Sequence, residues 1–263
     1  MEKNALLFLL LCIFPLCAIG QSGEDINITD QTGKKQGLWI KKYPNGNIQY
    51  EGIFKNDHPV GEFKRYSEDK RLQSHMIYSS DGKEVDATHY HPNGFIASRG
   101  KYINQMKEGK WEFFSSFYEG YLISEESYIN NKRNGPSFKF YPDSTVFEKV
   151  TYVNDKKEGE WLQNYPNGKQ FLRSNYSNNL LEGKFEVWYE NGISEMTGYY
   201  SRNFRHGTWQ IFNADGTLKY KAEYELGMTK DKQMDIDATE LMDRLEKNQG
   251  NIPDPEKTGE IIR

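Results

Sequence analysis

The segment of residues 152–168 has the sequence YVNDKKEGEWLQNYPNG, and its pattern recurs through most of the chain. An aromatic residue leads the segment, a glycine follows seven positions later, and a second aromatic stands two positions after the glycine. The same glycine recurs at intervals of 24 residues, or of 26 or 48 where a unit is lengthened or lacks its glycine: Gly37, Gly61, Gly109, Gly135, Gly159, Gly183 and Gly207. A fixed interval of this size is typical of a protein built from small repeated units.

The aromatic spacing is kept even where the glycine is lost. From the second unit on, an aromatic stands seven residues before each glycine position: Phe54, Tyr78, Tyr102, Tyr128, Tyr152, Tyr176 and Tyr200, with Tyr224 continuing the series. Two further sets follow the glycine: Trp39, Phe63, Trp111, Trp161, Phe185 and Trp209, and then Tyr43, Tyr66, Tyr90, Phe114, Tyr141, Tyr165, Tyr189 and Phe212. Val85 replaces a repeat glycine, and Ala87 and Ser137 replace aromatics. We expect the third and fifth units to be less well packed for this reason.

Alternation of side chains within each unit predicts antiparallel strands. In the sixth unit Trp161, Gln163 and Tyr165 fall on one side of a strand, and Leu172, Ser174 and Tyr176 on one side of the next. Asn-Gly and Asp-Gly at 45–46, 93–94, 167–168, 191–192 and 215–216 predict tight hairpin turns of positive φ. Polar segments such as 107–109 and 156–159 predict looser turns between hairpins, and the insertion at 115–120 a longer turn or bulge. The sequence therefore predicts an all-β fold: an elongated, twisted antiparallel sheet of eight 24-residue hairpins, sixteen strands in all, over residues 37–230.

The first 20 residues have the pattern of a secretory signal peptide. An apolar run at 5–19 ends in the small residues of a cleavage site, and it is shorter than the roughly 20 residues of a membrane span. An uncleaved anchor and a lipoprotein attached at Cys17 are the alternatives. Cys12 and Cys17 are the only cysteines, so the chain after cleavage would have no thiol. We expect export to the periplasm, the cell surface or the extracellular space, with residues 21–36 leading into the repeats.

Residues 231–263 form an acidic tail, with nine acidic against five basic residues. Met234, Ala238, Leu241 and Leu245 share one face of a predicted short helix, and Asp235 or Asp237 is expected to cap its start. This helix is expected either to cover the end of the last repeat or to dock a partner.

Composition and motifs argue against most function classes. Without the tail the charges balance, which disfavours nucleic-acid binding and leaves membrane contact only weakly supported. His89 and His91 are the only close histidine pair, and surface or ring-substituting roles are the simpler explanation. Glu108, Glu158 and Glu182 precede repeat glycines, and their recurrence indicates turn stabilisation rather than catalysis. No phosphate-binding loop, nucleophile motif or zinc signature is present.

The pattern Tyr-x-Asn followed by Glu-Gly-x-Trp-x-x-x-Tyr-Pro-Asn-Gly in residues 152–168 resembles the MORN repeat variant. Most of all it resembles bacterial exported proteins described as antitoxin components, over residues 37–227. The resemblance implies a repeat scaffold that binds, and in the antitoxin-like case neutralises, a partner. We therefore expect a non-enzymatic scaffold with no cofactor and no metal, binding an unknown protein. The alternatives are a carbohydrate or envelope polymer bound through exposed aromatic rows and, less favoured, a lipid surface.

Overall fold

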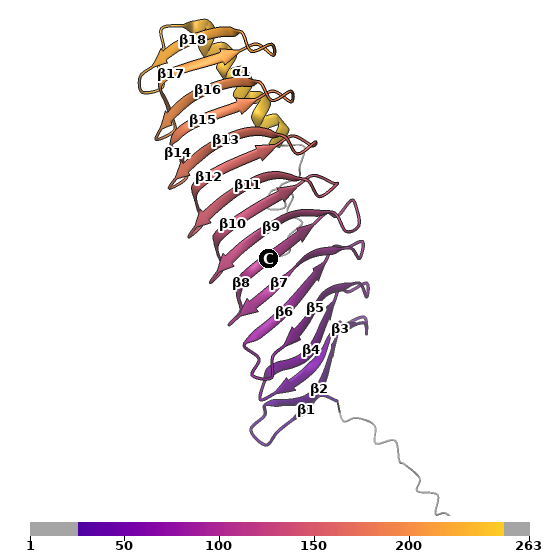
Figure 1. The fold of residues 1–263 in the computed structure, drawn as a ribbon. Helices are drawn as coiled ribbons and strands as arrows, with labels where there is room; N and C mark the ends of the chain where they lie inside the picture. The colour runs from indigo at the N-terminus through magenta and orange to yellow at the C-terminus, as the bar shows by residue number, and fades with distance from the viewer. Residues whose placement is uncertain (1–25, 250–263) are drawn as a thin grey trace, which may run out of the picture.

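Each 24-residue unit forms one β-hairpin, and the hairpins join into a single antiparallel sheet (Figure 1). The computed structural model describes residues 26–249. The hairpin strands are β2 (Lys35–Lys42), β3 (Ile48–Lys55), β4 (His58–Tyr66), β5 (Leu72–Tyr78), β6 (Glu84–Tyr90), β7 (Ile96–Ile103), β8 (Met106–Phe114), β9 (Leu122–Ile129), β10 (Lys132–Phe140), β11 (Val146–Val153), β12 (Lys156–Asn164), β13 (Gln170–Ser177), β15 (Gly183–Trp188), β16 (Ser194–Ser201), β17 (Phe204–Phe212) and β18 (Leu218–Tyr224). The predicted fold class and its eight hairpins are confirmed. The predicted signal peptide at 1–20 lies outside the described residues.

Two short strands complete the sheet of 18. Strand β1 (Ile28–Thr29) pairs with the edge strand β2, and β14 (Leu180–Leu181) leads into β15. Each hairpin strand pairs with the next hairpin strand along the chain, and β14 and β15 both pair with β13, so the sheet is an elongated ladder of curved strands (Figure 1).

Register places the repeated rings on one face, which we call the ring face. Trp161 lies opposite Ser174 and Gln163 opposite Leu172, as the alternation predicts. The ring face also carries Phe63, Trp111, Phe185 and Trp209, all buried. Neighbouring rings pack edge to face, as where the Phe185 and Tyr200 centroids lie 5.3 Å apart. The opposite side of the sheet is the outer face.

The turns predicted within the hairpins are confirmed, whereas the looser turns predicted between the hairpins are wrong. The tight turns lie between units, at pairs such as Asn154-Asp155 and Asn178-Asn179, where both residues have positive φ. The segment predicted as a looser turn, 156–159, instead belongs to β12. The Pro-Asn-Gly turns close the hairpins as predicted: the glycine has positive φ, 78° at Gly168, and its N–H donates to the Tyr165 carbonyl oxygen at 2.9 Å. The polar residues and the glycine of segment 156–159 suggested a loop, but Gly159 lies inside a strand.

The repeat glycine forms a bulge inside a strand. Val150 pairs with Trp161, but the following pair is Tyr152 with Lys157, so β12 carries extra residues around Gly159, whose φ is 77°. A glycine accepts this backbone conformation at little cost. In the third unit Val85 replaces the glycine, and β5 and β6 stay in unbroken register up to the Tyr78–Val85 pair. The bulge is lost together with the glycine.

The two positions of the third and fifth units that lack a repeat ring are nevertheless buried. Ala87 and Ser137 are buried, because larger residues stand opposite them on the preceding strand: Met76 faces Ala87 and Glu126 faces Ser137. Where the ring is large, the opposing residue is small, as for Gly198 facing Trp209. The insertion after β8 forms a lengthened turn, as predicted, closed by the Ser115 N–H donating to the Tyr121 carbonyl oxygen at 2.9 Å.

Helix α1 (Lys232–Gln249) packs on the last units (Figure 1). Met234 and Ala238 are fully buried in the same cluster as Trp209 and Tyr224. The predicted capping residues are wrong: Asp231 accepts the Met234 N–H at 3.0 Å. Asp235 and Asp237 instead form ion pairs with the sheet, at 3.1 Å with the guanidinium of Arg205 and 2.8 Å with the ammonium of Lys219. The side chains of Leu241 and Leu245 lie outside the described set.

Candidate functional site

The outer face carries rows of polar side chains that run across the strands in register. One such row follows opposed pairs from β4 to β9 and contains Lys64, His75, Thr88, Arg99, Glu112 and Glu125. Residues directly opposed on neighbouring strands have their Cβ atoms about 5 Å apart. The row therefore forms a continuous polar band across several units, with charged side chains at Lys64, Arg99, Glu112 and Glu125.

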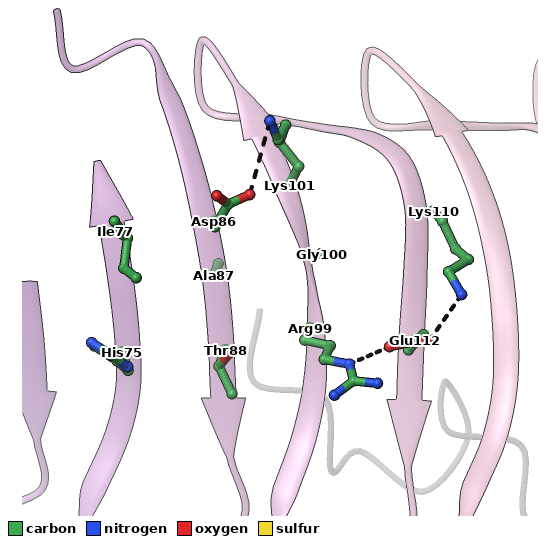
Figure 2. Close-up of a pocket in the computed structure, with 10 residues that line it drawn as sticks. All are labelled: His75, Ile77, Asp86, Ala87, Thr88, Arg99, Gly100, Lys101, Lys110 and Glu112. Atoms are coloured by element: carbon green, nitrogen blue, oxygen red, sulfur yellow. Dashed lines mark hydrogen bonds and ion pairs between the residues drawn. The ribbon is translucent and has the colours of Figure 1, made fainter. Parts of the chain in front are cut away.

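A shallow groove of about 370 Å³ interrupts this band over β5 to β8 (Figure 2). Alternate outward side chains of the four strands form its walls: His75, Ile77, Asp86, Thr88, Arg99, Lys101, Lys110 and Glu112. Ala87 and Gly100 lie at its floor, since residues at these positions direct their side chains to the ring face. Ile77 is 53% exposed and gives the groove an apolar side.

Ion pairs hold the charged walls in place. Glu112 accepts from the guanidinium of Arg99 and from the ammonium of Lys110, the latter at 3.0 Å. Lys110 also reaches Glu125 at 2.7 Å, and Lys101 lies 3.9 Å from Asp86 (Figure 2). Partial burial acts to raise the pKa of Glu112, but the two cations outweigh it and the pKa lies below its usual value. Glu112 is therefore a carboxylate at neutral pH and suits charge recognition rather than proton transfer.

The same triad of charges occurs a second time, on β13 and β15. Arg173, Lys184 and Glu186 occupy the repeat positions of Arg99, Lys110 and Glu112. Arg173 is opposed to Glu186, and Lys184 pairs with Glu186 at 2.6 Å. What distinguishes the groove is its place beside the third unit, the unit without a repeat glycine.

The two histidines of the predicted pair have separate structural roles. The ring of His91 is buried and its Nε2 lies 3.0 Å from the carbonyl oxygen of Phe114. Tyrosine hydroxyls make the same contact in other units, as where Tyr165 donates to the Trp188 carbonyl at 2.7 Å. His89 stacks on Trp111, and burial lowers its pKa, with a further contribution from Lys107. Over residues 26–249, His, Cys, Asp and Glu form no group of three suited to a metal ion.

The recurring glutamates bind the tight turns of the next unit. The backbone N–H groups of Asn130, Asn178 and Arg202 donate to Glu108, Glu158 and Glu182 at 3.0, 2.8 and 2.9 Å, respectively. The contact recurs at unit spacing, as turn stabilisation requires.

The repeat rings do not form exposed aromatic rows. Trp111, Trp161 and Trp209 are buried, and the Trp209 indole N–H donates to the Tyr199 carbonyl at 3.1 Å. Strongly exposed aromatics are instead scattered, among them Phe117 and Tyr118 in the long turn. The sequence reasoning also missed Arg99, Lys101 and Lys110. Their signal was their place on the outward side of strands next to the unit that lacks its glycine.

Comparison with known proteins supports the repeat assignment. Three segments match the MORN repeat variant. These are residues 35–56, 157–178 and 205–226, which fall in the first, sixth and eighth hairpins. No curated protein matches the chain. Similar solved structures include TcdB2-TccC3 (14% identity, TM-score 0.19) and TcdB2-TccC3-TEV (11% identity, TM-score 0.20); each alignment covers 75% of this chain. The chain spans 12% of the length of those chains. Within residues 26–249, no helix combines the length and apolar character needed to cross a membrane.

Proposed function

We propose that the protein is a non-catalytic repeat scaffold that binds another protein across its outer face, centred on the groove over β5 to β8. The observation that carries the proposal is the polar band of the outer face, whose charged side chains are held in register over successive units and which is hollowed over β5 to β8. Binding energy on such a surface sums over several strands, as in other repeat proteins with extended binding surfaces. The exposed side chain of Ile77 among fixed charges is a combination that suits a protein interface.

The test uses the two matched triads. Full-length chain, the double variant Arg99→Ala/Lys110→Ala and the control Arg173→Ala/Lys184→Ala are used to capture partners from a cell-envelope extract. We expect one stoichiometric partner with the wild type and the control, and its loss with the groove variant. Thermal melts of all three check that the fold is kept. Equal capture by all three, or no stoichiometric partner at all, contradicts the proposal.

We further propose that this binding takes place outside the cytoplasm, because residues 1–20 have the pattern of a signal peptide. Fractionation of cells that make the full chain tests it, and uncleaved chain confined to the cytoplasm would refute export. An antitoxin-like action, in which the scaffold covers the working surface of its partner, draws support from the sequence resemblance alone. The test of this action is co-expression: the scaffold should relieve the toxicity that the captured partner causes when it is expressed alone.

Polymer binding remains the alternative, but it has lost its main support because Trp111, Trp161 and Trp209 are buried. Retention on a peptidoglycan column that is weakened by substituting the exposed Tyr118 would favour it over protein binding.

A further inference from the structure

The C-terminal end of the sheet contains the beginning of a ninth unit. Leu226 and Gly227 both have positive φ, 50° and 83°, as do the residue pairs of the tight turns between units. The Gly227 N–H donates to the Arg205 carbonyl at 2.9 Å, the contact that the second turn residue also makes in the earlier tight turns. Glu225 and Met228 then pair across the turn as a short antiparallel bridge.

After Met228 the chain leaves the path that a ninth strand would follow. It reaches Asp231, which caps α1, and the helix packs on β18. Met234 and Ala238 close the ring layer at this end. The apolar end of the repeat stack is therefore covered, while the strand position beside β18 is not filled by the helix.

The free edge of β18 has open peptide groups. Among residues 26–249, β17 is the only strand that pairs with β18. Glu225 exchanges both of its backbone hydrogen bonds with Met228 on the open side. Peptide groups alternate along an antiparallel strand, so those of Lys221 and Glu223 point to the same open side.

A groove of about 790 Å³ marks this vacant position. It is lined by residues 221–226 and 228–231, with His206 and Gly207. The other end of the sheet is different: β1 pairs with β2, and the indole N–H of Trp39 donates to the Ile28 carbonyl at 3.0 Å. One edge is thus partly covered by β1, whereas no strand of residues 26–249 covers the outer side of β18.

The repeat indicates which charges a ninth strand would carry. Lys221 occupies the repeat position of Arg99 and Arg173. Arg99 pairs with Glu112 of the following unit, and Arg173 stands opposite Glu186 of the following unit. An added strand should therefore place an acidic residue opposite Lys221.

A basic residue belongs two positions earlier on the added strand. In the repeats, Lys110 and Lys184 stand at this spacing but within the glycine bulge, where Lys101 pairs with Glu108 instead. In a regular antiparallel strand without the bulge, the residue two positions earlier falls opposite Glu223, whose negative charge favours a basic residue there.

We propose that an extended segment of a partner protein adds to β18 as a further antiparallel strand, with a basic residue opposite Glu223 and an acidic residue opposite Lys221. Backbone hydrogen bonds supply the affinity in this mode of recognition, and the alternating side chains supply specificity. The site is separate from the outer-face groove and does not depend on the function proposed for that groove.

The probe is a fluorescein-labelled peptide, Thr-Val-Lys-Ser-Glu-Val-Thr, titrated with the full chain. Its control is the charge-swapped Thr-Val-Glu-Ser-Lys-Val-Thr, which we expect to bind about fivefold more weakly or worse because both charge pairs become repulsive. Lys221→Pro removes a backbone N–H that points to the open side of β18, a position where an edge strand tolerates proline. This variant should therefore fold but lose peptide binding. Lys221→Ala keeps that N–H and should weaken binding only severalfold, while Arg99→Ala/Lys110→Ala should leave it unchanged.

Hydrogen exchange gives an independent readout. The amides of Lys221 and Glu223 should exchange quickly in the free chain and slowly with the peptide. Equal binding of the two peptides, no saturable binding, or unchanged binding by a folded Lys221→Pro chain overturns the proposal. Slow exchange of both amides without peptide also overturns it, because the edge would then be occupied by the chain itself or by a second copy. If Lys221→Pro unfolds the chain, Glu223→Pro provides the same test at the next outward amide.

Discussion

Gly198 shows how single residues are matched across neighbouring units. A Cβ built at this position would lie 2.1 Å from the Trp209 ring, and the same holds for Gly100 and Trp111 at 2.4 Å. We expect Gly198→Ala to destabilise the protein by about 2 kcal/mol or more, because the fully buried indole has no room to move.

The control for this prediction is the double variant Gly198→Ala/Trp209→Ala. The pair Met76 and Ala87 shows that a larger residue is accepted where the ring is absent. Chemical unfolding of the four proteins should give a favourable coupling of about 1 kcal/mol or more. Strictly additive losses would show that the two positions are not matched in size.

Glu148 is a buried carboxylate on the ring face, only 5% exposed. It accepts the Trp161 indole N–H at 3.0 Å and the Gln163 amide at 2.9 Å, and Lys139 lies 3.4 Å away. Burial by itself acts to raise the pKa of Glu148, but the lysine and the two donors outweigh it, and the pKa is lowered from 4.5. The folded state therefore binds this proton less readily than the unfolded state. The resulting stability is present above pH 4.5 and is lost as the pH falls through the lowered value.

We expect Glu148→Gln to cost about 2 kcal/mol at pH 7, because a charged hydrogen-bond acceptor is replaced by a neutral amide in a buried site. The stability difference between wild type and variant should shrink as the pH is lowered below 4.5. Urea unfolding at pH 7, 5 and 3.5 measures it, and a difference that grows on acidification would contradict the lowered pKa.

At the scale of the hairpin, the tight turns depend on glutamates from the preceding unit. Glu158 accepts the Asn178 N–H, whereas Glu160, two residues on, pairs with Arg173 on the outer face. We expect Glu158→Ala to lower stability by about 1 kcal/mol through loss of a turn hydrogen bond. Glu160→Ala should change it by less than about 0.5 kcal/mol, since exposed ion pairs contribute little. Thermal or urea unfolding measures both variants. Equal losses of stability would show that the Glu158 hydrogen bond contributes no more than an exposed ion pair.

The hairpins themselves were predictable because ring spacing and alternation report directly on burial. The Asn-Gly turns within the hairpins were predictable as well, but the turns between hairpins were not, since a glycine of positive φ serves equally in a loop and in a bulge, and local sequence does not separate the two. Gly159 was placed in a loop but belongs to a bulged strand. The groove over β5 to β8 was also beyond the sequence. Its walls come from alternate residues of four strands, which only the register of the folded sheet brings together.

On the scale of the whole molecule, each hairpin touches mainly its neighbours, so stability is expected to vary along the sheet. Helix α1 covers the ring layer of the final units, with Met234 fully buried and Ile236 exposed on the same helix. We expect Met234→Asp to detach the helix, because the change would bury an unpaired charge. Amide exchange should then rise in β17 and β18 and stay unchanged in β2 to β9, while Ile236→Asp should leave both regions as in the wild type. Faster exchange along the entire sheet would mean instead that the eight hairpins unfold as one cooperative body, with the helix as a support for all of them.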